Sequence, residues 1–345
     1  MKKYVYLSVI SLFIVTLFYS CSNSEIANNC NKDTTVEVIS YAETGTLGNL
    51  FPLSVDNALS QRIISLIHEG LVTIDPLTLS IKPGIAETWR IDQTEKEYRF
   101  YLNTNVYFNK DECFKDGTRK LTADDVIYSL TKLCTKSEDN KFAEAFVEQI
   151  EGAKEYYEGK SNKITGIVKE NDSTILIKLT KPNPMFLQFL ASPAAVVYPK
   201  EAYEKYGKSL TVGVGPFYIK QFPENNKPMI LCKNNLYFKK DIKGTCLPYL
   251  DTIKIYFQKS VREQLELIKD GKLDIVINVN EEVLSDFLEK NIKLFEGEKA
   301  TLKLLPANTF TSVKLQHILK SNIENFFLND FNHFDLRELK IKKSK

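Results

Sequence analysis

The chain has 345 residues, of which 43% are hydrophobic and 26% are charged. This length is sufficient for a large core and for two domains. Because 46 Lys and Arg residues nearly balance 44 Asp and Glu residues, we do not expect the basic face of a nucleic-acid-binding protein. Only three His residues are present, and we predict neither a metal site nor a cofactor.

The chain opens with a pattern typical of export. A basic head, Met1-Lys2-Lys3, precedes an apolar run from Val5 to Tyr19. This run is short for a permanent transmembrane helix, but it suits the core of a signal peptide. We therefore predict a signal peptide over residues 1–20.

The end of that run resembles a bacterial lipobox, because the small residue Ser20 stands before Cys21. Phe18 departs from the usual Leu, so a plain signal peptide is the alternative. We expect Cys21 to carry a lipid, which anchors a protein without spanning the membrane. The polar residues 21–34 are predicted to form a flexible tether.

The remaining cysteines are five in number, and no CxxC pair occurs among them, which argues against zinc and dithiol chemistry. Cys232 and Cys246 bracket a predicted strand-loop-strand stretch. A disulfide between them and idle thiols are both open interpretations.

The first half of the mature chain is predicted to mix strands and helices. Thr35–Tyr41 alternates like a strand, and Ser60–His68 is an amphipathic helix that ends before Gly70. Thr122 is placed to cap a helix over Ala123–Cys134. Further predicted elements are strands at Leu71–Ile74, Glu97–Leu102 and Val106–Phe108, and a helical stretch at Phe142–Tyr157.

The second half continues the same mixture, beginning with a hairpin whose turn is Asn171-Asp172. Its strands are predicted at Ile164–Val168, Ser173–Leu179, Phe217–Phe222, Met229–Cys232, Thr252–Phe257, Leu273–Val279 and Thr301–Leu305. Its helices are predicted at Pro182–Leu190, Pro199–Tyr206, Ser260–Lys269 and Glu281–Lys290. Strands and helices interleave without a strict βαβ rhythm, which predicts a mixed α/β protein.

The sequence contains no convincing catalytic motif. Gly159-Lys160-Ser161 ends an imperfect phosphate-loop pattern with six intervening residues where four are needed, and GxSxG and HExxH are absent. We predict that the chain is not an enzyme.

Six ordered blocks stand out along the chain: Ile67–Val72 (IHEGLV), Ile81–Trp89 (IKPGIAETW), Leu121–Leu130 (LTADDVIYSL), Gly213–Tyr218 (GVGPFY), Asn235–Phe238 (NLYF) and Gly271–Ile275 (GKLDI). Together they resemble the solute-binding family 5 of ABC transporters, which includes periplasmic dipeptide- and oligopeptide-binding proteins. Asn103 replaces the Arg usual in this family, and Asn109–Phe114 resembles an insertion.

The resemblance implies a periplasmic binding protein of type II-like fold, in which two lobes close around a solute by a hinge motion. Residues 35–59 and 181–305 are expected to form lobe one, nearly complete, and 60–180 a subdomain inserted into it. Residues 306–345 are expected to be a truncated start of lobe two or a disordered tail, so that lobe two is mostly absent.

The resemblance also implies ligand contacts at Asp56, Asn57 and Ala58, in a loop that contacts peptide in relatives, and at Phe142. A solvated loop Asp and a core Phe are the alternatives for Asp56 and Phe142. Peptide-binding relatives hold the ligand as an added strand.

We accordingly expect a monomeric lipoprotein on the periplasmic or cell-surface face of the cytoplasmic membrane. It would capture peptides for the permease of an ABC importer with a separate ATPase. A non-transporting truncated remnant, or a binder of nickel chelate or oligosaccharide, is the alternative.

Overall fold

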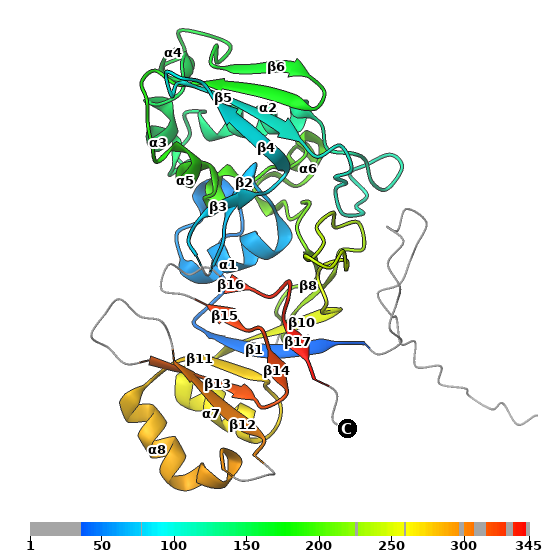
Figure 1. The fold of residues 1–345 in the computed structure, drawn as a ribbon, viewed down its shortest axis with the longest axis vertical. Helices are drawn as coiled ribbons and strands as arrows, with labels where there is room; N and C mark the ends of the chain where they lie inside the picture. Colours follow the sequence, from blue (N-terminus) through cyan, green and yellow to red (C-terminus); the bar gives the residue numbers. More distant parts are fainter. Residues whose placement is uncertain are drawn as a thin grey trace, which may run out of the picture.

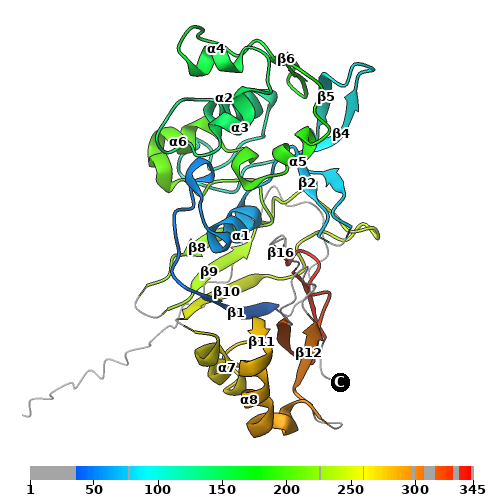
Figure 2. The same ribbon diagram turned by 90° about the vertical axis from the view of Figure 1, so that its left-hand side faces the viewer.

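The computed structural model describes residues 36–76, 78–224, 227–258, 260–296, 300–306, 315–328 and 334–342. The predicted signal peptide, Cys21 and the tether lie outside these residues. The described part is a mixed α/β structure, with a large sheet at one end of the long axis and a smaller sheet with several helices at the other (Figures 1 and 2).

The large sheet has seven strands, and β1 (Val38–Thr44) lies in its interior between β10 and β11, parallel to both. Five consecutive residues of β1 are buried, as expected for a strand covered on both faces. The strand order is β12 (Leu302–Pro306), β13 (Leu315–Lys320), β11 (Ile275–Asn280), β1, β10 (Thr252–Gln258), β9 (Met229–Lys233) and β8 (Phe217–Gln221). The other neighbouring pairs are antiparallel.

Helices cover both faces of this sheet. Successive side chains of a strand point to opposite faces, so neighbouring residues of β1 contact different helices. Tyr41 belongs to the same buried cluster as the apolar side of α1 (Ala58–Ile67). Ala42, the next residue of β1, belongs to the cluster of α7 (Val261–Lys269) and α8 (Glu281–Asn291). The helix that follows β1 therefore lies on one face of the sheet, and the helix that follows β10 lies on the other.

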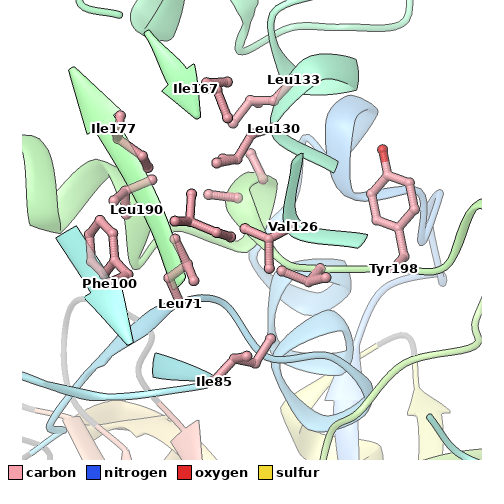
Figure 3. Close-up of a cluster of buried hydrophobic side chains, with 14 of the residues drawn as sticks. Leu71, Ile85, Phe100, Val126, Leu130, Leu133, Ile167, Ile177, Leu190 and Tyr198 are labelled. Carbon is pink, nitrogen blue, oxygen red and sulfur yellow. The ribbon is translucent and has the colours of Figure 1, made fainter. Parts of the chain in front are cut away.

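The smaller sheet is antiparallel and packs with the remaining α-helices around a second core, shown in Figure 3 with Phe100, Val126 and Ile177 labelled. Its order is β4 (Ala86–Ile91), β5 (Glu97–Leu102), β7 (Thr174–Lys178) and β6 (Ile167–Asn171). The helices are α2 (Ala123–Leu133), α3 (Ala143–Val147), α4 (Ala153–Tyr157), α5 (Phe186–Leu190) and α6 (Lys200–Tyr206).

The remaining strands form three short two-stranded sheets. β2 (Val72–Ile74) pairs with β3 (Ile81–Pro83), β14 (Ile323–Glu324) with β17 (Lys340–Ile341), and β15 (Phe327–Leu328) with β16 (Phe334–Asp335). Four 3-10 turns are also formed within the described residues, at Pro52–Ser54, Pro193–Ala195, Gly207–Ser209 and Ile292–Leu294.

Several predicted elements differ from the structure in their bounds, such as β6, which is shifted from Ile164–Val168 to Ile167–Asn171, and two differ in kind. Val106–Phe108 is not a strand, because its only bridge is an isolated one from Tyr107 to Lys120. The stretch Phe142–Tyr157 is two short helices, because Gly152 takes a left-handed φ of 74° between them. A Cβ on Gly152 would lie 2.3 Å from Thr165 Oγ1, so this turn needs glycine.

The hydrophobic clusters can be compared with the predicted domain boundaries, which stay predictions. Helix α1 packs with the large sheet, whereas the proposed subdomain begins at residue 60. Buried residues from Phe186 to Val214 pack with the smaller sheet, beyond the proposed limit of 180. Beyond residue 305, β13 pairs inside the large sheet, and Ile323 and Leu336 join the cluster beneath α1. The described part of residues 306–345 thus packs with the large sheet, and the division into lobes and a subdomain stays a prediction.

Candidate functional site

The carboxyl ends of the parallel strands mark one edge of the large sheet as a candidate site. β1, β10 and β11 are parallel, so their last residues, Thr44, Gln258 and Asn280, lie along the same edge. The helices that follow β1 and β10, α1 and α7, lie on opposite faces of the sheet, which makes this edge a topological switch point. In open α/β sheets, ligands bind outside the carboxyl ends at such a switch point.

Polar side chains are arranged across this edge. Thr44 pairs with Gln258 in the ladder, and Tyr41 pairs with Ile275. Thr44 and Asn278 each lie three residues beyond this pair, so they stand about equally far along β1 and β11. Gln264 of α7 donates through Nε2 to Thr44 Oγ1 at 2.9 Å, and its buried Oε1 has no hydrogen-bond partner among the described residues. The edge thus retains unused hydrogen-bonding capacity.

Asn278 is a candidate site residue that the sequence did not predict. It lies in a bulge of β11, its side chain is exposed, and its φ is +55°. Its N–H donates to Nδ1 of His317 at 3.2 Å. Burial lowers the pKa of His317 to about 4, so the ring is neutral at pH 7 and Nδ1 accepts. Asparagine tolerates this conformation, but nothing in its local sequence signals the bulge.

The predicted contact loop leads into α1. Asn57 caps this helix, because its Oδ1 accepts a hydrogen bond from Ser60 N at 2.8 Å, and Ala58 is its first residue. Asp56 is 58% exposed and pairs with Lys141 Nζ at 2.8 Å. The hydrogen bond and charge of Lys141 lower the pKa of Asp56.

Phe142 adjoins this loop in space, because the neighbouring Lys141 donates from its backbone N to Leu53 O at 3.0 Å. Phe142 is partly buried and packs against both large hydrophobic clusters. The structure therefore brings the four predicted contact residues to one region. It also gives Asn57 and Phe142 clear structural roles, and ligand contact by all four remains a prediction.

A buried ion pair fixes α1 to the end of β1. Arg62 Nε donates to Glu43 Oε1 at 2.7 Å, and both side chains are buried. Burial raises the pKa of Glu43, and the hydrogen bond and charge of Arg62 oppose this rise. The pair therefore fixes the position of α1 relative to the carboxyl end of β1.

A separate hollow of about 130 Å³ lies at the other end of α1, and none of the four predicted residues lines it. Its lining includes His68, Glu69 and Ser192, together with Asp335 and Arg337 from the C-terminal segment. His68 is fully buried, which lowers its pKa to about 3.

A buried charge network forms one wall of this hollow. Glu69 accepts from Tyr237 Oη at 2.6 Å and from Lys239 Nζ at 3.0 Å, and Arg337 Nη1 lies 3.7 Å from its Oε1. Arg337 also binds Asp335, with 2.6 Å between Nη2 and Oδ2. Burial lowers the pKa of Lys239 against the opposing charge of Glu69. The network joins three segments that are distant in the sequence.

The described cysteines fall into two groups. Cys232 and Cys246 are both disulfide-bonded, whereas Cys113 and Cys134 are free thiols. Pairing of the first two with each other remains a prediction. In the described ranges, no group of three or more His, Cys, Asp and Glu side chains is arranged to hold a metal. No helix in those ranges has both the length and the apolar character needed to cross a bilayer.

Comparison with known proteins identifies the family. Residues 80–316 match the family described as bacterial extracellular solute-binding proteins, family 5 Middle. The dipeptide-binding protein of Escherichia coli K12 is 30% identical over 171 residues, covering 47% of this chain and 31% of that protein. The periplasmic oligopeptide-binding protein OppA of the same strain is 30% identical over 167 residues, covering 47% and 29%.

The fold has solved counterparts. A periplasmic oligopeptide-binding protein from Borrelia burgdorferi superposes with a TM-score of 0.64 at 24% identity, covering 80% of this chain and 54% of that one. Listeria monocytogenes OppA bound to peptide gives 0.63 at 18% identity, covering 78% and 50%. The chain spans about a third of the length of the curated relatives it matches. It belongs to the family 5 bacterial extracellular solute-binding proteins.

Proposed function

We propose that this chain is the substrate-binding component of an ABC importer and that it captures peptides. The observation that carries the proposal is the exposed side chain of Asn278 at the carboxyl edge of the parallel strands. The exposed Asp56, in the loop between β1 and α1, adds a carboxylate. An extended peptide offers regularly spaced N–H and C=O groups, which amide and carboxylate groups complement.

The names of relatives favour peptide over other solutes. Dipeptide-, di/tripeptide- and oligopeptide-binding proteins are among them. Heme-binding protein A of Haemophilus influenzae and a structure with agropinic acid are also among the matches. Membership therefore leaves the solute open, and the alternatives are another small solute and a chain that transports nothing.

The cellular setting that we propose follows from the same membership. Relatives include periplasmic binding proteins, and the sequence around Cys21 favours a lipid anchor that holds the protein at the outer face of the cytoplasmic membrane. A permease with a separate ATPase would receive the solute. We propose that the protein is a monomer and not an enzyme.

Thermal-shift titration of the full chain with a library of di- to pentapeptides tests the proposal. A ligand that binds only the folded state adds about 2.7 kcal/mol of stability at a concentration of 100 Kd, so the melting temperature should rise. Asp56→Asn should reduce the rise. Asp172→Asn is the matched control, because Asp172 is also an exposed Asp paired with a Lys at 2.8 Å, in the β6–β7 turn.

A cooperative melt that no peptide shifts would reject peptide binding and favour the non-transporting alternative. A shift produced by heme or by an oligosaccharide, but by no peptide, would instead select another solute. An equal effect of Asp56→Asn and Asp172→Asn would remove Asp56 from the site while leaving the function intact.

A further inference from the structure

The bulge at Asn278 has an unusual pairing. Val276 pairs with Ile318 and Val279 with Gln316, so that Ile277 and Asn278 together face His317 on β13. This count of two residues opposite one defines a β-bulge, and such bulges often lie next to binding sites, where they redirect a side chain. A left-handed φ at a residue other than glycine is uncommon and needs support from its surroundings.

His317 supplies that support through its side chain. The backbone N–H of Asn278 donates to Nδ1 of His317 at 3.2 Å, so the imidazole takes the place of a carbonyl in the ladder. This pairing requires the proton of the neutral ring to be on Nε2. The Nε2 atom is buried without a hydrogen-bond partner among the described residues.

The ring of His317 is itself held firmly. The residue is 3% exposed, and its ring centroid lies 5.4 Å from that of Phe326 with an interplanar angle of 72°. Phe326 comes from the C-terminal segment that packs beneath α1. A ring fixed in this way can impose a conformation on Asn278, whereas the exposed Asn278 side chain has no comparable packing.

We propose that His317 is a positioning residue, which holds Asn278 in the left-handed conformation so that the Asn278 amide hydrogen-bonds an extended peptide main chain at the carboxyl edge. The amide offers one acceptor oxygen and an NH₂ donor, and a peptide unit offers the complementary N–H and C=O. This inference rests on the proposed function and deepens it, because it assigns a residue that recognises the ligand backbone rather than its side chains.

A pair of variants of equal size tests the positioning role. His317→Asn keeps an acceptor, because Oδ1 of Asn lies close to the position of Nδ1 of His, whereas His317→Leu has none. We expect His317→Leu to weaken peptide binding about tenfold, the effect of one lost hydrogen bond, measured by isothermal titration calorimetry on the full chain. His317→Asn should stay within about threefold of the wild type.

A double-mutant cycle separates positioning from general damage. Asn278→Gly accepts the left-handed backbone but lacks the amide, so it should weaken binding about as much as His317→Leu. If His317 acts through Asn278, the double variant should bind no worse than either single one. If His317→Leu melts below the assay temperature, Asn278→Gly still tests the amide contact, and His317→Asn with its double variant then supplies the cycle.

Two outcomes would overturn the inference while leaving the proposed function intact: equal binding by His317→Leu and His317→Asn, or additive losses in the double variant. Unchanged binding by Asn278→Gly would overturn it as well. Failure of the wild type to bind any peptide would instead reject the proposed function, and with it the ligand contact assigned to Asn278.

Discussion

Replacement of Glu69 by Gln would test the buried charge network that joins α1 to the C-terminal segment. Glu69 is 6% exposed and faces Lys239 at 3.0 Å and Arg337 at 3.7 Å. Glutamine can still accept the hydroxyl of Tyr237, but it cannot neutralise either cation. The substitution therefore leaves two largely buried cations, whose side chains are 16% and 20% exposed, with one carboxylate fewer between them.

The expected loss follows from the burial of these groups. Breaking a buried ion pair by removing one partner costs about 3–5 kcal/mol, because the remaining charge is uncompensated. Since Tyr237 keeps its acceptor, we expect the lower end, about 3 kcal/mol in the free energy of unfolding. Adding Lys239→Met to Glu69→Gln removes one unpaired cation and should recover part of this loss.

The assay is urea unfolding of the full chain, followed by far-UV circular dichroism and by fluorescence of Trp89, the single tryptophan. The control is Glu97→Gln, which removes a half-exposed pair with Lys178 at 3.2 Å; it should cost less than about 1 kcal/mol. A loss for Glu69→Gln no larger than that of the control would refute the reasoning, because the network would then behave like a solvated surface pair.

The loss in Glu69→Gln should also depend on pH, and the sign follows from Lys239. Burial holds the pKa of Lys239 below its unfolded value, and the charge of Glu69 opposes that decrease. Without Glu69 the pKa falls further, so the unfolded state binds more protons than the folded state and stability rises with pH toward the unfolded pKa. The deficit should therefore shrink as the pH rises from neutral toward about 10.4, the unfolded pKa of a lysine.

The remaining predictions concern buried titratable groups. The pKa values of His68 and His317 are lowered to about 3 and about 4, so the folded state resists protonation that the unfolded state accepts below its pKa of about 6.5. Stability should fall from pH 6.5 to pH 5, by up to about 1.4 kcal/mol per pH unit for each His; equal urea midpoints at pH 7 and pH 5 would contradict this. Arg62→Met should cost about 3–5 kcal/mol by leaving Glu43 buried and unpaired. Adding Glu43→Leu should restore most of that loss, and a double variant no more stable than the single one would argue against a buried pair.

Elements with strong local signals were predicted well from the sequence. β5 was placed at Glu97–Leu102, as in the structure, because its side chains alternate between buried and partly buried. α2 was predicted to begin after Thr122, and Asp125 indeed accepts from Thr122 N at 2.9 Å. The strand predicted at Val106–Phe108 was wrong, because a strand requires a partner along its length and alternation alone does not reveal one.

The candidate site was predicted only in the part that the family resemblance covers. The loop at Asp56 was identified from matching blocks, and its place near Lys141 emerged from the fold. Asn278 was missed, because its conformation depends on His317, 39 residues away on a strand that was not predicted. Bulges arise from the register between two strands, which local periodicity does not encode.

The sequence by itself determined the family resemblance, the mixed α/β class and most element positions, because caps, turns and hydrophobic periods are local signals. The tertiary structure alone decided which parts of the chain form one core. It placed β1 between strands more than 200 residues away along the chain and joined Glu69 to Arg337. Long-range pairing and burial of charge depend on the whole fold, because each requires a partner that proximity in the sequence does not supply.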